Sequence, residues 1–457
     1  MDVFLPSCEK SNRNYGEMID SLHKRFSIME DGVRGIRTVD KIGTIHKVTG
    51  LILESDGPEV TIGQVCTITS DRHKTEVEAE VVGFSGKNVL LMALDSIHLI
   101  HPGCKVISRK NSNIVPAGAS LLGRVIDGMG RPIDGKGPLN CSHRDGFHAA
   151  PPNPLKRDLI KESFSSGIKS IDTCIPLGRG QRVGVFAGSG VGKSILLGMI
   201  AKGSSAEINV ISLVGERGRE LREFIENDLG PEGLAKSVII VSTSDQPAPM
   251  RIRASIMATA IAEGFRDDGK NVLFMMDSLT RFAMAQREIG LAAGEPPASR
   301  GYVPSVFSML PKLLERTGTN DSGAITAIYT VLVEGDDMNE PVADAVRGFL
   351  DGHIVLSRKL ANANHFPAID VLRSVSRLDR AVCSENEMEL ISKLRDLLSV
   401  YKQNEDLINV GAYVKGSNPK IDLSIEKFPL IEAFLKQRYD QTSNRDLAIR
   451  QLSEVLS

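Results

Sequence analysis

A glycine-rich segment that ends in a lysine and a serine could bind the phosphates of a nucleotide. Ala187-Gly-Ser-Gly-Val-Gly-Lys193-Ser194 follows the apolar run Val183-Gly-Val-Phe-Ala and precedes Ile195-Leu-Leu-Gly-Met-Ile. This order of strand, loop and helix is the one that a phosphate-binding loop requires. Backbone amides and the positive end of the helix dipole would face the phosphates, and the loop amides are those of Gly188, Ser189, Gly190, Val191 and Gly192. The alternative, a chance match in a glycine-rich turn, is disfavoured by the flanking runs.

The last two residues of this segment carry its chemistry. Lys193 can reach the β- and γ-phosphates of ATP, and the Ser194 hydroxyl can ligate Mg²⁺. The first position of the usual pattern is Ala187 rather than glycine, and a small residue is compatible with the turn. The segment therefore predicts binding of ATP with Mg²⁺.

Two acidic residues at the ends of apolar runs could complete a hydrolytic site. Glu216 follows Leu213-Val-Gly, on a strand that we expect beside the strand of the phosphate loop. A carboxylate there can orient and polarise a water aimed at the γ-phosphate, although it could instead start a helix and pair with Arg219. Asp277 ends Asn271-Val-Leu-Phe-Met-Met and can act on Mg²⁺ directly or through water.

A third element is Pro367-Ala-Ile-Asp-Val-Leu-Arg-Ser-Val-Ser376-Arg377. An arginine at a subunit boundary can stabilise the charge on a phosphoryl group that is transferred in a neighbouring subunit's site. Composition alone equally allows Arg377 to form a surface salt bridge.

The bulk composition narrows the class of protein. The 457 residues predict two to four domains, and the net charge of −2 with no tryptophan argues against strong nonspecific binding of nucleic acid. No apolar stretch is long enough for a transmembrane helix, and the chain start lacks a signal-peptide pattern. The six cysteines are scattered, which predicts free thiols in a reducing cytosol.

The chain divides into four predicted parts. Residues 1–37 contain an amphipathic helical pattern from Tyr15 to Met29, which could pack on its own domain, bind a partner or lie on a membrane surface. Residues 38–108 hold short β-rich runs, Val60-Thr-Ile among them, that predict a small β-barrel. Residues 109–380 predict the ATPase domain, with 117–138 read as tight turns and a hairpin. Residues 381–457 predict a helical domain, which begins with a capping box at Ser384-Glu-Asn-Glu387.

The predicted fold class is α/β. Between about residues 160 and 380, apolar runs alternate with helical patterns, which indicates a mostly parallel sheet with helices on both faces. The expected strands are 183–186, 209–214, 238–242, 272–276, 324–331 and 353–356. Ligands of such sheets bind beyond the carboxyl ends of the strands, where the motifs above lie.

Taken together, these residues closely resemble the catalytic subunits of the rotary ATPase superfamily. Pro367 to Ser376 fits its signature P-[SAP]-[LIV]-[DNH]-xxx-S-x-S at every position, and Gly215-Glu-Arg-Gly-Arg-Glu and Asp277-Ser-Leu-Thr-Arg281 resemble two further core motifs. The region from Gly294 to Arg316 resembles the protein-export branch. Val410-Gly-Ala-Tyr413-Val-Lys-Gly-Ser417 favours the flagellum-specific export ATPases. The resemblance spans roughly residues 38 to 457 and implies a RecA-like ATPase domain.

The resemblance also implies residue roles. Lys193 and Ser194 match the phosphate and Mg²⁺ ligands, Glu216 the catalytic carboxylate, and Arg377 the finger supplied across the subunit interface. Arg217 matches an arginine that connects this region to the neighbouring chain. Phe366 and Tyr413 stand where the family places aromatic residues around adenine, although relatives often have tyrosine at the Phe366 position and Phe366 could simply pack in the core.

Partners are implied in the same way. The family forms a homohexamer that associates peripherally with the cytoplasmic face of the inner membrane. There its partners are the export gate and chaperone–substrate complexes of flagellar proteins. Its variable N-terminal segment contacts a FliH-like regulator, which becomes the favoured role of residues 1–37. A FliJ-like coiled-coil protein lies in the ring, and no DNA is involved.

Three other functions compete with this one. A non-catalytic nucleotide-binding ring subunit would typically lack the carboxylate at the Glu216 position. An RNA-translocating hexameric helicase shares the phosphate loop, but the near-neutral charge and few aromatic residues disfavour it. A virulence injectisome ATPase would perform the same chemistry in another machine, and the regulator that co-purifies would separate it from a flagellar one.

Overall fold

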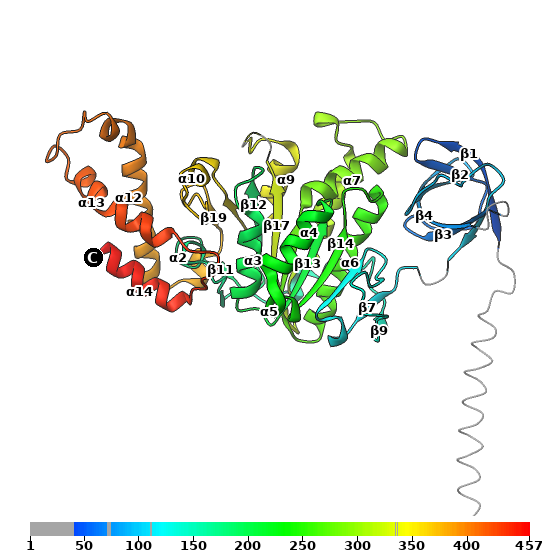
Figure 1. Cartoon of the computed structure of the whole chain (residues 1–457), viewed down its shortest axis with the longest axis horizontal. Helices are drawn as coiled ribbons and strands as arrows, with labels where there is room; N and C mark the ends of the chain where they lie inside the picture. The colour runs from blue at the N-terminus through cyan, green and yellow to red at the C-terminus, as the bar shows by residue number, and fades with distance from the viewer. Residues whose placement is uncertain (1–40, 71–74, 110–111, 334, 336) are drawn as a thin grey trace, which may run out of the picture.

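The computed structural model describes residues 41–70, 75–109, 112–333, 335 and 337–457. The predicted amphipathic helix at Tyr15–Met29 lies outside the described residues. A barrel stands at one end of the described chain and three long helices at the other, with a large sheet between them (Figure 1). This arrangement confirms the predicted fold class, whereas the four domain boundaries stay predictions.

The barrel closes because six short strands pair edge to edge. Its order is β1-β2-β5-β4-β3-β6, and all pairs are antiparallel. Inward-facing residues such as Ile45, Leu53 and Leu91 are fully buried. The strands are β1 Ile42–Thr49, β2 Ile52–Ser55, β3 Val65–Ser70, β4 Thr75–Ser85, β5 Asn88–Ala93 and β6 Lys105–Ser108.

One predicted strand of the barrel is wrong. Val60-Thr-Ile forms no strand but leads into a turn. Pro58 lacks an amide for a ladder just before it, and Gly63 turns the chain at a φ of 82° just after it. Three apolar or β-branched residues are too few to outweigh these neighbours.

The central sheet has nine strands in the order β19-β18-β12-β17-β15-β13-β14-β8, with β16 pairing with β17 off this path. Only the pairs β18–β19 and β16–β17 are antiparallel, so the carboxyl ends of the main strands meet at one edge. Their bounds are β8 Arg124–Asp127, β12 Arg182–Ala187, β13 Ile208–Val214, β14 Ser237–Ser242, β15 Asn271–Asp277, β16 Gly318–Thr319, β17 Ala324–Leu332, β18 Gly352–Val355 and β19 Val375–Ser376.

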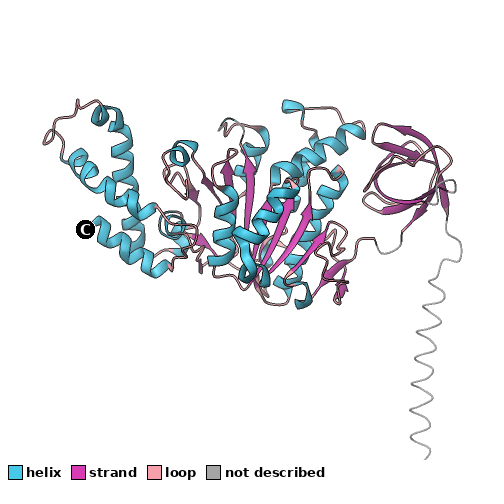
Figure 2. Cartoon of the chain, viewed as in Figure 1, coloured by secondary structure: helices cyan, strands magenta, loops and turns pink. Residues whose placement is uncertain are grey.

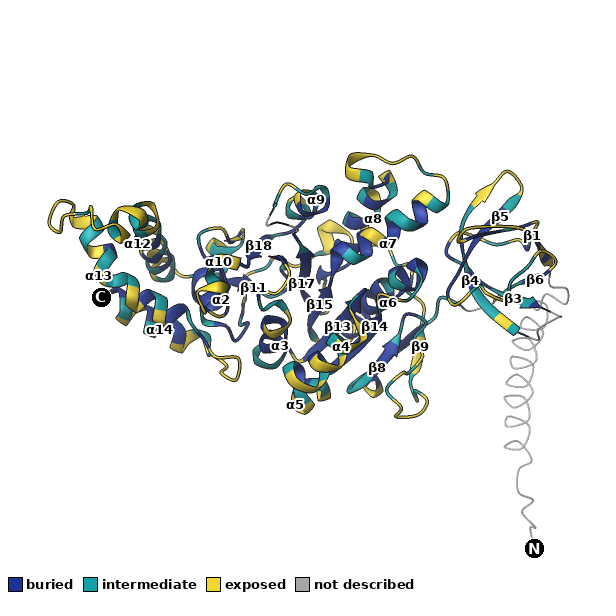
Figure 3. Cartoon of the chain, turned by 45° about the horizontal axis from the view of Figure 1, so that its top comes forward, coloured by how far each residue is buried: buried dark blue, intermediate teal, exposed yellow. Residues whose placement is uncertain are grey.

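Both faces of this sheet are covered, so its strands are apolar along their whole length. Successive residues of β15 enter two different cores: Phe274 belongs to one and Leu273 and Met275 to the other. The first core contains α6 Ala248–Asp267, α7 Leu279–Ala292, α8 Pro304–Leu314 and α9 Pro341–Phe349, and the second contains α3 Lys193–Gly203 with the π-helical η3 Phe224–Leu229. Figure 3 shows the buried sheet between these layers.

Shorter elements connect the layers (Figure 2). They are β7 Val115–Ala117, η1 Ala119–Leu121, β9 Ser142–Arg144, η2 Pro154–Lys156, β10 Ser163–Phe164, α2 Lys169–Cys174, β11 Leu177–Gly178, α4 Gly218–Glu223, α5 Gly230–Ala235, η4 Ser299–Gly301, α10 Arg358–Asn362 and α11 Asp379–Val382.

The C-terminal helices are α12 Glu385–Asn409, α13 Pro419–Leu435 and α14 Arg445–Leu456, and all three pack against α2. The predicted capping box begins α12. The Glu387 amide donates to the Ser384 hydroxyl, and the Ser384 amide donates to the Glu387 carboxylate at 2.7 Å. Reciprocal bonds of this kind satisfy two amides that the first turn of a helix leaves free.

Residues 117–138 contain more than the predicted turns. Arg124–Asp127 form β8, which extends the sheet parallel to β14. The chain then turns back, and Arg124 donates two hydrogen bonds to the Asp134 carboxylate, from Nε at 2.7 Å and from Nη2 at 3.0 Å. These bonds hold the pKa of Asp134 well below its usual range. The density of Gly, Asp and Pro around a four-residue strand concealed it in the sequence.

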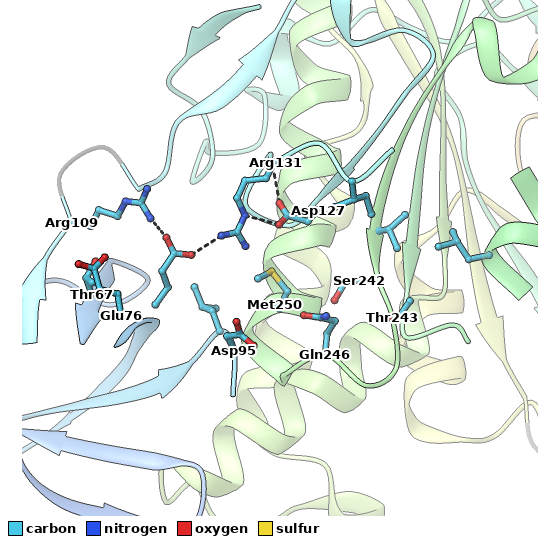
Figure 4. A pocket seen from close by; sticks show the side chains of 15 residues that line it. Thr67, Glu76, Asp95, Arg109, Asp127, Arg131, Ser242, Thr243, Gln246 and Met250 are labelled. Atoms are coloured by element: carbon cyan, nitrogen blue, oxygen red, sulfur yellow. Dashed lines mark hydrogen bonds and ion pairs between the residues drawn. The ribbon is translucent and has the colours of Figure 1, made fainter. Parts of the chain in front are cut away.

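The barrel is fixed to the sheet by charged residues of β4. Glu78 pairs with Arg109 and, at 3.0 Å, with Arg131, which also pairs with Asp127 (Figure 4). These residues line a cavity of about 750 Å³ between the barrel and the sheet. None of the residues predicted for nucleotide binding lines this cavity, so it is separate from the candidate site.

A second, buried contact lies beside this cavity. Arg253 of α6 is 1% exposed, donates to Glu80 at 3.0 Å and to the Ser112 carbonyl at 2.9 Å, and stacks 4.4 Å from the Phe147 ring centroid. Burial raises the pKa of Glu80, against the pull of Arg253. The guanidinium therefore compensates a carboxylate that has lost its water.

Among the described residues, no helix combines the length and apolarity needed to cross a membrane.

We predict that Arg253→Met destabilises the protein by about 3 to 5 kcal/mol, because it leaves the Glu80 carboxylate buried without its cation. Urea unfolding followed by circular dichroism measures the change. Lys270→Met is the matched control, since the Lys270–Glu207 pair is about half exposed and should contribute about 1 kcal/mol or less. Equal losses from both variants would contradict the role given to Arg253.

Candidate active site

The phosphate loop has the strand–loop–helix geometry that the sequence predicts. β12 ends at Ala187, residues 188–192 form the loop, and α3 begins at Lys193. Gly190 and Gly192 have φ values of 77° and 88°, a left-handed conformation that costs a glycine little. Gly188 and Val191 are buried, whereas Ser189, Gly190 and Ser194 are exposed. The first amides of α3 and the Ser194 hydroxyl therefore face an open site.

Lys193 brings the two predicted carboxylates together. Its Nζ lies 2.6 Å from Asp277 Oδ1 and 3.5 Å from Glu216 Oε1. All three side chains are largely buried, Asp277 the most. The alternative pairing of Glu216 with Arg219 does not occur, since Arg219 pairs with Glu223.

The sheet order corrects one expectation about Glu216. Its strand β13 is not beside β12 but is separated from it by β17 and β15. Asp277, at the end of β15, lies between the lysine and Glu216 in this order. The length of the lysine side chain is what allows one ammonium to contact both acids.

Backbone contacts fix the position of Glu216. The preceding Gly215 has a φ of 72°, and its amide donates to the Ser242 carbonyl at 2.7 Å. The Ser244 amide donates to the Glu216 carbonyl at 3.0 Å. A Cβ on Gly215 would come within 2.9 Å of the Arg281 side chain, so glycine there permits both the turn and the approach of Arg281.

The charges of this cluster shift one another. Burial lowers the pKa of Lys193, but Asp277 and Glu216 outweigh burial, so the lysine pKa lies above its ordinary value. Burial raises the pKa of Glu216, Lys193 lowers it, and Asp277 and Glu220 raise it again, so the net shift is upward. A carboxyl whose pKa is moved toward neutrality is suited to take up a proton during catalysis.

Two residues near the cluster were not predicted as site residues. Thr330 of β17 donates from Oγ1 to Asp277 Oδ1 at 2.7 Å, and Arg281 lies against Gly215. Thr330 sits inside an apolar run and shows no local signal. Arg281 stands in the Asp-Ser-Leu-Thr-Arg motif, where its position could have been used.

Phe366 lies next to the phosphate loop. A Cβ on Gly192 would be 3.4 Å from the Phe366 ring, which is 40% exposed. The ring is thus partly exposed rather than packed in the core. The Phe366 carbonyl accepts from the Gln437 amide at 3.0 Å, which holds this loop against the end of α13.

Tyr413 is placed differently. It lies in the connection between α12 and α13, at the outer end of the C-terminal helices (Figure 1). Its hydroxyl lies 3.0 Å from both the Asp422 carboxylate and the Asn418 carbonyl and can donate its one proton to either of them. The structure ties Tyr413 into this loop and does not bring it together with Phe366.

The two predicted arginines are exposed. The Arg217 side chain is 82% exposed and lies 3.5 Å from Glu220. Arg377 follows β19, where its amide donates to the Asp351 carbonyl at 3.0 Å and its Nη2 to the Arg347 carbonyl at 3.2 Å. In the described part of the chain Arg377 pairs with no carboxylate, so the surface salt bridge of the alternative interpretation is not formed there.

The residues present fit a nucleotide with Mg²⁺. Lys193 is a buried cation next to open amides of a helix N-terminus, which is a site for phosphate. Ser194 and Asp277 supply the oxygen atoms that Mg²⁺ prefers. Fold and site together define a P-loop ATPase.

Comparison with known proteins assigns this ATPase to a family. The nucleotide-binding domain of the ATP synthase alpha/beta family matches residues 167–376, its β-barrel domain matches 45–110, and the type III secretion EscN ATPase C-terminal domain matches 383–454. The chain is 53% identical to the flagellum-specific ATP synthase of Bacillus subtilis (strain 168), over 91% of this chain and 95% of that protein. It is 45% identical to the type 3 secretion system ATPase of Xanthomonas euvesicatoria, over 95% and 97%.

A solved structure agrees with these matches. The assembled ATPase EscN of the enteropathogenic E. coli type III secretion system, in complex with its central stalk EscO, superposes with a TM-score of 0.83 at 43% identity, covering 91% of this chain and 100% of that one. The chain belongs to the ATP synthase alpha/beta family, within the group formed by flagellum-specific ATP synthases and type III secretion ATPases. The family recognised from the sequence is confirmed.

We predict that the acid limb of kcat/KM for ATP lies at higher pH than an ordinary glutamate, whose pKa is about 4.3, would give. Glu216 must be ionised to act as a base, and its raised pKa means that activity is lost earlier as pH falls. Glu220→Gln removes a charge that raises this pKa, so it should move the limb to lower pH. Steady-state rates across pH measure the shift. Glu223→Gln on the same helix should leave the acid limb in place. An acid limb that does not move in Glu220→Gln would contradict the assignment of the limb to Glu216.

Proposed function

We propose that this protein hydrolyses ATP and couples hydrolysis to the type III export of flagellar proteins across the cytoplasmic membrane. The observation that carries the proposal is the meeting of Lys193, Asp277 and Glu216 at the carboxyl edge of the sheet. A non-catalytic ring subunit would not need a carboxylate beside the phosphate-loop lysine.

The roles follow from these positions. Lys193 exchanges its carboxylate partners for the β- and γ-phosphates, while the amides of residues 188–192 bind phosphate oxygens. Ser194 and Asp277 hold Mg²⁺, which when bound neutralises charge on the phosphates. Glu216 orients a water toward the γ-phosphate and accepts its proton, helped by its raised pKa. Phe366, whose ring lies next to Gly192, would stack on adenine. The same role for Tyr413 would require the α12–α13 connection to move toward the phosphate loop.

The proposed assembly is a homohexamer in which Arg377 of one subunit completes a neighbour's site, with Arg217 contacting the adjacent chain. Support comes from the exposure of both arginines and from the hydrogen bond of the Arg377 amide to the Asp351 carbonyl, which fixes the backbone of Arg377. The assembled state of the EscN relative is further support. An arginine held by its own backbone and without a carboxylate partner is free to stabilise charge elsewhere.

The proposed partners follow the family. Residues 1–37 would bind a FliH-like regulator, and a FliJ-like coiled-coil protein would enter the ring, as the central stalk EscO accompanies EscN. The ring would associate peripherally with the cytoplasmic face of the inner membrane, contact the export gate and receive chaperone–substrate complexes. The flagellar machine is favoured over the injectisome by the segment Val410-Gly-Ala-Tyr413-Val-Lys-Gly-Ser417, while both kinds of relative match most of the chain.

We predict that Glu216→Gln lowers the ATPase rate by about a hundredfold or more, because a positioned base contributes roughly that much. Binding of ATP with Mg²⁺ should change little, since the phosphate loop is intact. Steady-state rates against protein concentration, for wild type and variant, measure this. Wild-type activity per subunit should rise with concentration as rings form; unchanged turnover in the variant would remove Glu216 from its role.

Mixing two inactive variants tests the shared site. Lys193→Ala should lose nucleotide binding, and Arg377→Ala should bind but fail in catalysis. Mixed rings should regain part of the wild-type rate, because some interfaces then pair an intact phosphate loop with an intact arginine. Native mass spectrometry verifies the mixing, and verified mixed rings without activity would argue against an arginine supplied in trans.

A further inference from the structure

A fully buried threonine holds the carboxylate that faces the metal position. Thr330 lies in β17, between the strands that carry the phosphate loop and Asp277. Its Oγ1 is 2.7 Å from Asp277 Oδ1 and 3.4 Å from the Met276 carbonyl. A hydroxyl has one proton to donate, and the shorter, charge-assisted bond to Asp277 is the stronger of the two.

The same carboxylate oxygen also meets the phosphate-loop lysine. Lys193 Nζ is 2.6 Å from Asp277 Oδ1, so the two donors converge on one atom. The second oxygen, Oδ2, accepts no hydrogen bond from any residue that the structure describes. Thr330 thus fixes Oδ1 of the carboxylate, and Oδ2 is left for a ligand.

We propose that Thr330 is a positioning residue for Mg²⁺: its hydroxyl pins Asp277 Oδ1 and so presents Oδ2 to the metal or to its water shell. This inference rests on the proposed function, in which Asp277 acts on the metal. The bond gains importance when Lys193 leaves Asp277 for the phosphates, because Thr330 is then the remaining donor to Oδ1. A second donor of this kind keeps the carboxylate from rotating as its first partner departs.

A purely structural threonine would behave differently. In a buried strand, valine fills the same space as threonine but lacks the hydroxyl, so Thr330→Val keeps the shape and removes the donor. Serine keeps the hydroxyl and loses only a methyl group. The pair separates a role in orientation from a role in packing.

The experiment compares wild type, Thr330→Val, Thr330→Ser and the control Thr326→Val. Thr326 is equally buried in the same strand, but its hydroxyl accepts from the Gly180 amide at 2.9 Å, away from the acids. Mn²⁺ serves as a spectroscopic stand-in for Mg²⁺, and electron paramagnetic resonance of free Mn²⁺ gives its affinity for each protein saturated with ADP. The Mg²⁺ dependence of ATP hydrolysis is measured alongside.

Thr330→Val should weaken Mn²⁺ binding by about tenfold, the scale at which partners of metal-binding residues usually act, and should raise the half-saturating Mg²⁺ concentration in parallel. Thr330→Ser should stay within about twofold of wild type, and Thr326→Val should lower the melting temperature without moving metal affinity. Wild-type metal affinity in Thr330→Val, or an equal loss in both valine variants, would overturn the inference. If wild type itself hydrolyses no ATP, the proposed function fails instead, and the Mn²⁺ affinities still decide the role of Thr330.

Discussion

The ion pair of Lys193 with Asp277 is the contact on which the rest of the site depends. An ammonium taken out of water costs several kcal/mol unless carboxylates and hydrogen bonds replace its hydration, and here two acids do so. The pair can form only if three segments far apart in sequence end at one place. The parallel register provides this: Leu213 of β13 pairs with Asp277, Met276 with Tyr329 of β17, and Ala187 of β12 with Leu332.

This register also shows what the sequence could and could not predict. Apolar runs of four to eight residues predicted the parallel strands, because a strand covered on both faces has no polar side. Acids at the ends of two of these runs marked Glu216 and Asp277. The order of the strands depends on how the helices pack and is not written in any single strand, so β13 was expected beside β12. Thr330 and the approach of Phe366 to Gly192 result from contacts across the sheet and the loops, which no local pattern reports.

Charged side chains of the C-terminal helix α12 connect it to the ATPase domain. Arg395 of α12 donates to the carbonyl of Ser374 at 3.0 Å and to that of Cys174 at 3.2 Å, and Lys402 lies 3.5 Å from Asp370. Ser374 is three residues before Arg377, so these bonds connect α12 to the segment that carries this arginine. The capping box closes the first turn of α12, and the helix packs on α2.

Nucleotide and metal binding are linked by the same ion pair. If Lys193 moves to the phosphates as proposed, Asp277 and Glu216 remain as two buried carboxylates with one cation fewer, which is unfavourable at short range. A divalent cation would restore the balance, since it would bring two positive charges to these carboxylates. Phosphate without metal therefore leaves the carboxylates uncompensated, and metal without phosphate competes with the Lys193 ammonium for Asp277. Binding of phosphate frees Asp277 for the metal, and binding of the metal compensates the carboxylates that Lys193 leaves. The charge network of Lys193, Asp277 and Glu216 therefore favours binding of nucleotide and metal together.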